Sequence, residues 1–126
     1  MENAKFNFED LKVYQKALDF IDEVYETTRG FPKQEMYTLS SQYVRAGISI
    51  ALNIAEGSGD TDAQFNRYLQ IAIDSVRECV VCSTIARRQK YITVDQDNKA
   101  RIKLVELSKM ISSLQKYLKN KPTKKN

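Results

Sequence analysis

The stretch from Tyr37 to Gly59 carries more apolar side chains than one neighbouring layer of a protein can cover. On a helix, these side chains fall on two adjacent arcs, each about 100° wide. The first arc has the spacing of an ordinary core face and holds Met36, Leu39, Tyr43, Ala46, Gly47, Ile50 and Ile54. The second arc holds Val44, Ile48, Ala51, Leu52 and Ala55. Because a lone subunit would leave the second arc exposed, the sequence predicts that these five residues form an interface between copies of the chain.

A narrow polar strip completes the circumference of this helix and consists of Gln42, Arg45, Ser49, Asn53 and Glu56. Arg45 and Glu56 are about three turns apart, too far to pair within one helix. Each needs a partner elsewhere, and Asp74 or Glu78 is the candidate for Arg45. We therefore predict an interhelical or intersubunit network, the alternative being a surface on which Arg45 contacts phosphate.

Apolar periodicity predicts four helices, at about residues 8–28, 33–57, 62–89 and 95–119. Asn7 is the expected cap of the first helix, and conformational freedom at Gly57 and Gly59 is expected to end the second. Thr61 to Gln64 and Thr93 to Gln96 match capping boxes before the third and fourth. Short connections make consecutive helices antiparallel neighbours. The expected fold is all-α, an up-down-up-down four-helix bundle forming a single domain over residues 1–120, followed by a basic, disordered tail at 121–126.

The 126-residue sequence contains no histidine. This excludes Ser-His-Asp and Cys-His catalysis and metal sites that require an imidazole ligand. Cys79 and Cys82 lie in mid-helix without further zinc ligands, which favours inert, mostly buried thiols. We predict no catalytic residue, no cofactor and no metal, and hence no enzyme. No apolar run approaches the ~20 residues of a membrane span, so a cytoplasmic protein without membrane contact is expected.

The chain has a net charge of +4 and a sequence pI of about 9.0, a balance that permits an anionic partner without demanding one. The candidate nucleic-acid contacts are Arg87, Arg88, Lys90, Lys116, Lys119 and Lys121. The first three lie at the predicted C-terminus of the third helix and the last three at that of the fourth. Positive charge is favourable at a helix C-terminus even on a solvated surface. Only Tyr91 and Tyr117 are interleaved to stack on bases, so an RNA-binding surface is the alternative to a merely solvated one.

Several spaced motifs run through most of the chain. The first helix contains Phe8-x-x-Leu11-x-x-Tyr14-x-x-Ala17, and the third contains Phe65-x-x-Tyr68-Leu69-x-x-Ala72 with Ser75-x-x-Glu78. Between them lie Phe31-Pro32-x-x-Glu35 and Leu39-x-x-Gln42-x-x-Arg45-Ala46-x-x-Ser49-Ile50-x-x-Asn53-Ile54-Ala55-Glu56-Gly57. This pattern resembles the 23S rRNA intervening-sequence protein family. Two positions depart from it: Asp60, where many members carry a basic residue, and Gly47, where a larger apolar residue is usual.

The resemblance implies a bacterial four-helix bundle that assembles into a ring, commonly a pentamer, without established enzymatic activity. The family is also distantly similar to accessory proteins of diversity-generating retroelements, which bind nucleic acid and a reverse transcriptase. The expected function is therefore a homo-oligomeric accessory protein that binds RNA or a nucleic-acid-associated protein. The alternative is a purely structural or protein-binding oligomer that does not bind nucleic acid.

Overall fold

The computed structural model describes residues 4–122, and within this range the chain is all-α, as predicted. The helices are α1 (Lys12–Arg29), α2 (Leu39–Ser58), α3 (Asp62–Arg88) and α4 (Val94–Asn120). Two short 3₁₀ helices, η1 (Asn7–Asp10) and η2 (Lys33–Glu35), precede α1 and α2. None of the helices in the described range has the length and apolar character needed to cross a membrane. Of the predicted tail, residues 123–126 lie outside the described residues.

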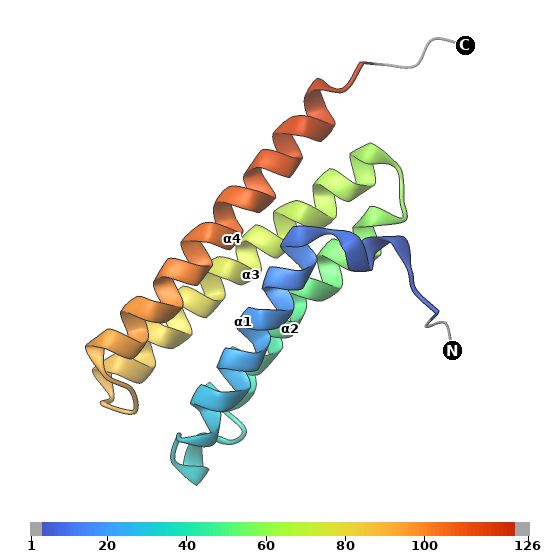
Figure 1. Cartoon of the computed structure of the whole chain (residues 1–126). Helices are drawn as coiled ribbons and strands as arrows, with labels where there is room; N and C mark the ends of the chain where they lie inside the picture. The colour runs from blue at the N-terminus through green and yellow to red at the C-terminus, as the bar shows by residue number, and fades with distance from the viewer. Residues whose placement is uncertain (1–3, 123–126) are drawn as a thin grey trace.

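Consecutive helices run in opposite directions, and each packs against the next (Figure 1). The most extensive contact joins α2 to α3, while α4 returns to make a smaller contact with α1. Among the described residues, the backbones of α1 and α3 do not come close to each other, and neither do those of α2 and α4. The α1–α2 pair and the α3–α4 pair therefore lie on opposite sides of the molecule, around one core.

All four helices contribute to this core, for example through Phe20, Ile50, Leu69 and Leu107. The first apolar arc of α2 faces inward as its spacing predicts, and its buried members are Leu39, Tyr43, Ala46, Gly47, Ile50 and Ile54. Met36 is different, because it precedes α2 and is 53% exposed.

Two helices begin later than the sequence predicts. α1 begins at Lys12 because residues 7–10 form η1 and Leu11 is extended, and the carboxylate of Glu9 accepts the N–H of Phe6 at 2.7 Å. Asn7 therefore does not cap α1. α2 begins at Leu39 because the backbone of Thr38 is not helical.

The two predicted capping boxes differ in outcome. Before α4, Thr93 and Gln96 exchange both hydrogen bonds, at 2.8 and 3.0 Å. Before α3, the Thr61 hydroxyl accepts from the N–H of Gln64 at 3.2 Å, but the carboxylate of Asp60 accepts the N–H of Thr61 at 2.8 Å. Asp60 thus takes the place predicted for the Gln64 side chain.

Gly57 has a different role from the predicted one. No glycine in the chain has a positive φ, and Gly57 lies inside α2 rather than beyond its end. A Cβ atom at Gly57 would lie 2.6 Å from the Cβ of Tyr68 and 2.8 Å from a ring carbon of Phe65. The absence of a side chain therefore lets α2 and α3 approach each other closely.

We predict opposite effects for alanine at two glycines of α2. Gly57→Ala should lower the free energy of unfolding by about 2 kcal/mol, because the new methyl group overlaps α3. Gly47→Ala is the matched control, since its Cβ would lie 3.6 Å from the nearest heavy atom, on Val24. This second change should raise the free energy of unfolding by about 1 kcal/mol through helix propensity. Denaturant unfolding followed by circular dichroism measures both, and a Gly57→Ala variant as stable as the wild type would contradict the close packing.

Candidate functional site

An apolar groove of about 390 Å³ lies between α1 and α2. Its α2 wall contains four of the five predicted interface residues, Ile48, Ala51, Leu52 and Ala55. The remaining lining residues come from α1 and the segment before it, and they are Phe8, Tyr14, Leu18, Ile21 and Tyr25. Val44, the fifth predicted interface residue, is partly buried against the core of its own chain.

The groove residues differ in how far they project into solvent. Leu52 is 53% exposed, and across the groove Leu18 is 40% and Tyr25 is 42% exposed. Ala51 is only 6% exposed because α1 already covers that side of α2, and it belongs to the core. Leu52 is therefore the most exposed side chain of the second arc.

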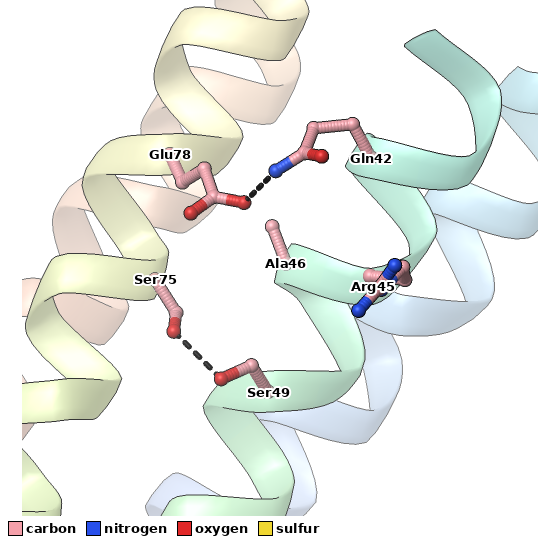
Figure 2. A pocket seen from close by; sticks show the side chains of 6 residues that line it. All are labelled: Gln42, Arg45, Ala46, Ser49, Ser75 and Glu78. Carbon is pink, nitrogen blue, oxygen red and sulfur yellow. Dashed lines mark hydrogen bonds between the residues drawn. The ribbon is translucent and has the colours of Figure 1, made fainter. Parts of the chain in front are cut away.

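Two residues of the polar strip, Gln42 and Ser49, reach side chains of α3 (Figure 2). The amide of Gln42 donates to the carboxylate of Glu78, and the hydroxyl of Ser75 donates to that of Ser49 at 2.8 Å. Asn53 bonds within its own helix, donating to the backbone oxygen of Ser49 at 2.8 Å. Gln42 and Ser49 therefore join α2 to α3, in agreement with the interhelical interpretation for these two residues.

The two charged residues of the strip lie outside this network. Arg45 and Glu56 are exposed, and neither forms an ion pair with another residue in the range 4–122. Figure 2 shows the Arg45 guanidinium apart from Glu78, whose carboxylate is bonded to Gln42 instead. Within the described chain, Arg45 therefore pairs with neither of its two candidate partners, Glu78 and Asp74.

A hollow of about 360 Å³ is lined by Gln42, Arg45, Ala46, Ser49, Ser75 and Glu78. Its polar groups can donate and accept hydrogen bonds, but they include no nucleophile paired with a general base. In the described part of the chain, no group of three His, Cys, Asp or Glu side chains could hold a metal ion. The groups that line the hollow are hydrogen-bond donors and acceptors from α2 and α3.

Burial also makes the two thiols unreactive. Cys79 and Cys82 are free and buried in α3. Burial raises the pKa of the Cys82 thiol to about 11 and raises the pKa of Cys79 further. Both thiols are protonated at neutral pH, as the mid-helix position of the pair suggests.

The six candidate nucleic-acid contacts divide into paired and free side chains. Nε of Arg87 lies 2.9 Å from Oδ2 of Asp97, and Nζ of Lys121 lies 3.1 Å from Oδ2 of Asp62. The other four are exposed and form no ion pair with any residue that the structure describes; they are Arg88, Lys90, Lys116 and Lys119.

The free basic side chains lie at two ends of the molecule. Arg88 and Lys90 precede the first turn of α4, and Lys116 and Lys119 belong to its last turns. α4 has 27 residues, so the two groups are separated by roughly 30 to 40 Å. Lys90 also has a φ of 64°, the left-handed conformation that closes the C-terminal end of α3. The six candidates therefore do not form one continuous patch on a single chain.

Asp97 is a buried carboxylate that the sequence analysis did not identify. It is 5% exposed and accepts hydrogen bonds from Ser83 at 2.6 Å and from Nε of Arg101 at 3.0 Å. Burial alone would raise the pKa of Asp97, but the Ser83 and Arg101 hydrogen bonds and the charges of Arg101 and Arg87 outweigh it and lower the pKa below its usual value. Asp97 lies three residues before the buried Ala100 and therefore on the same face of α4. This spacing is the feature of the sequence that could have identified it.

Comparison with known proteins gives one family and a solved relative. The sequence model of the family described as 23S rRNA-intervening sequence protein matches residues 9–113. The chain is similar to a crystal structure of a protein with unknown function from the S23 ribosomal protein family of Bacteroides thetaiotaomicron. The two are 27% identical with a TM-score of 0.76, over 82% of this chain and 98% of that one. No curated protein matches.

We predict that Asp97 links the stability of the α3–α4 pair to pH. Because the folded-state pKa of Asp97 is lowered, its stabilisation is present above the unfolded-state pKa and is lost as pH falls through the folded-state value. Asp97→Asn should cost about 3 kcal/mol of unfolding free energy at neutral pH and flatten the loss of stability in acid. Asp95→Asn, an exposed change in the same helical turn, is the control. Equal acid dependence in the wild type and Asp97→Asn would contradict this role.

Proposed function

The chain belongs to the 23S rRNA-intervening sequence protein family, and we propose that it is a non-enzymatic helical protein that self-assembles through its α1–α2 groove. The assembled form, a ring in keeping with the family resemblance, serves as an accessory module for an RNA or a nucleoprotein partner. A pentamer is the expected size of this ring.

The observation that carries the self-assembly is the open apolar groove. Leu18, Tyr25 and Leu52 border it with large exposed apolar surfaces. Burying a fully exposed side chain of this kind contributes about 1.5 to 3 kcal/mol, and the exposed half of each of these three can contribute roughly half of that. Contiguous apolar surface of this kind is typical of a protein interface. A partner copy that fills the groove would therefore gain a substantial free energy of association.

The two buried thiols and the side chains around the polar hollow support a function in binding rather than catalysis. The pKa of each cysteine thiol is raised, which opposes nucleophilic chemistry. The Glu78 carboxylate is bonded to Gln42, and the hydroxyls of Ser49 and Ser75 are bonded to each other. These groups are occupied in holding α2 against α3.

The first test places a charge in the groove. Leu52→Glu should convert the assembled protein to single copies while the helix content stays unchanged, because an ionised carboxylate cannot be buried without a partner. Ile71→Glu is the matched control, since Ile71 is 47% exposed on α3 and lies outside the groove. Light scattering coupled to size-exclusion chromatography measures the mass. A Leu52→Glu variant that keeps the wild-type mass would contradict assembly through the groove.

RNA binding by the assembly is supported by the free basic side chains at both ends of α4, namely Arg88, Lys90, Lys116 and Lys119. A ring would repeat each pair of charges around its axis and add their fields. This repetition compensates for the absence of a continuous patch on one chain. The alternative, an oligomer that binds only proteins, would use the same groove and leave these side chains to the solvent.

The second test measures the salt dependence of RNA binding. Affinity for a mixed-sequence single-stranded RNA should fall as salt rises, with a log-log slope of about −0.7 for each phosphate contact. Lys116→Glu combined with Lys119→Glu should reduce the slope, whereas Lys33→Glu, an exposed change in η2, should leave it nearly unchanged. Fluorescence anisotropy gives the affinities. Absence of binding at low salt would leave the protein-only alternative.

A further inference from the structure

We infer that the outer face of the C-terminal half of α4 binds one single strand of nucleic acid, which under the proposed function is an RNA. This inference rests on the proposed function and specifies where the strand lies and which side chains hold it. It is carried by exposed lysine, hydroxyl and tyrosine side chains at helical spacing, and by the absence of carboxylates among them.

The side chains of this face are three or four residues apart, so they line one side of the helix. Residues 107–126 contain six lysines and no aspartate or glutamate, although the whole chain has 16 acidic residues among 126. The exposed members of the face, which we call the basic face of α4, are Lys109, Ser112, Ser113, Lys116, Tyr117 and Asn120. An anionic partner therefore meets no carboxylate on the face itself.

Two carboxylates at the edges of the basic face are already paired. Glu106 lies one turn before Lys109, and its carboxylate is 2.9 Å from Nζ of Lys16 in α1. Asp62 lies at the start of α3, and its carboxylate is 3.1 Å from Nζ of Lys121. Each negative charge is therefore offset by a lysine that lies outside the face.

The unpaired charges around the basic face have a positive balance. α3 runs beside this half of α4, as the hydrogen bond from Gln115 to the backbone oxygen of Asn66 shows. On and before α3, Asp60 and Asp74 form no ion pair within residues 4–122. Four exposed basic side chains of the same region are also without an ion pair in that range, and they are Arg67, Lys109, Lys116 and Lys119. This excess favours a polyanion.

Tyr117 adds an aromatic surface to the basic face. Its side chain is 61% exposed, and in the described chain the backbone of η1, which precedes α1, does not come close to α4. Nζ of Lys121 lies 5.7 Å from the centroid of the Tyr117 ring. A base can stack on such a ring only when it is free of a duplex, and any of the four bases can do so. The exposed ring therefore favours a single strand over a duplex.

The spacing of the lysines suits the backbone of such a strand. Lys109 and Lys116 are about 10 Å apart along the helix axis. A stacked strand covers this length with about three nucleotides of 3.4 Å each. The hydroxyls of Ser112 and Ser113 lie between the two lysines, and hydroxyls are common donors to phosphate oxygens. The face can thus hold phosphates along its length and a base at Tyr117.

The opposite end of the molecule does not offer the same combination (Figure 1). There, the hydroxyl of Tyr91 donates to the carboxylate of Glu35 at 2.8 Å, and the ring is partly buried. Arg88 and Lys90 share this end with Glu35 and with the exposed Asp95. The basic face of α4 also remains accessible in the proposed assembly, because the α1–α2 groove lies on the other side of the molecule.

The first test removes the two lysines of the face. Lys109→Gln with Lys116→Gln should lower the log-log salt slope for a mixed-sequence single-stranded RNA by about 1.4, the value for two phosphate contacts. Lys33→Gln with Arg88→Gln is the matched control, because it removes two exposed, unpaired charges at the opposite end and should leave the slope unchanged. Fluorescence anisotropy over a salt series gives the slopes, and circular dichroism verifies folding.

The second test removes the aromatic ring. Tyr117→Ala should weaken binding of the same RNA about fivefold or more without changing the salt slope, because stacking involves no counterion. Tyr117→Phe should retain the wild-type affinity. Tyr37→Ala, at a tyrosine that is 88% exposed before α2, is the control and should also retain it. A fully paired RNA duplex should bind the wild type more weakly than the single strand, whereas a single-stranded DNA should lose affinity in the same variants.

The remaining outcomes separate the inference from the proposed function. If the wild type binds RNA and neither the lysine variant nor Tyr117→Ala weakens it, the strand lies elsewhere, and the inference is overturned while RNA binding stands. A loss of affinity in Tyr37→Ala in place of Tyr117→Ala would move the site to the opposite end and overturn it as well. Equal affinity for duplex and single strand contradicts the stacking. If the wild type binds no RNA at low salt, the proposed RNA binding fails together with the inference.

Discussion

The close approach of α2 and α3 is the contact on which the rest of the structure depends. Gly57 permits it at one end, where any side chain would overlap Tyr68, and Ser49 and Ser75 meet in a hydrogen bond farther along. Because α2 is held so tightly against α3, its remaining apolar side chains turn toward α1 or toward solvent. The α1–α2 groove is therefore a consequence of the α2–α3 contact, since α1 covers Ala51 and leaves Leu52 exposed.

Some charged side chains pair with one another inside the molecule, and others are exposed without a partner in the described chain. Asp97 holds Ser83, Arg87 and Arg101 in one cluster between α3 and α4, and Glu23 joins α1 to α4 by accepting from Lys103 at 2.7 Å. The side chains left without partners in the described chain are the ones available for recognition. They include Asp19, Asp22, Arg45 and Glu56, so the internal pairing determines which charges remain for a neighbour.

Much of the fold could be predicted from the sequence, and the errors have physical causes. The spacing of apolar residues located all four helices and the buried arc of α2, because burial on one face imposes that spacing. Helix starts were less accurate, since the turns at Asn7–Asp10 and Lys33–Glu35 satisfy local hydrogen bonds without continuing into a helix. For the candidate site, four of the five residues of the second arc line the α1–α2 groove, but the pairing of Arg87 with Asp97 depended on a residue from another helix.

The sequence by itself determined the all-α class, the apolar faces and the lack of histidine chemistry, because these follow from residue type and periodicity along one segment. Only the tertiary structure decided that Gly57 serves close packing, that Glu78 bonds to Gln42, and that Asp97 holds Arg87. Each of these depends on the distance between atoms of different helices. That distance is set by the packing of all the side chains between them, which no single segment of the sequence contains.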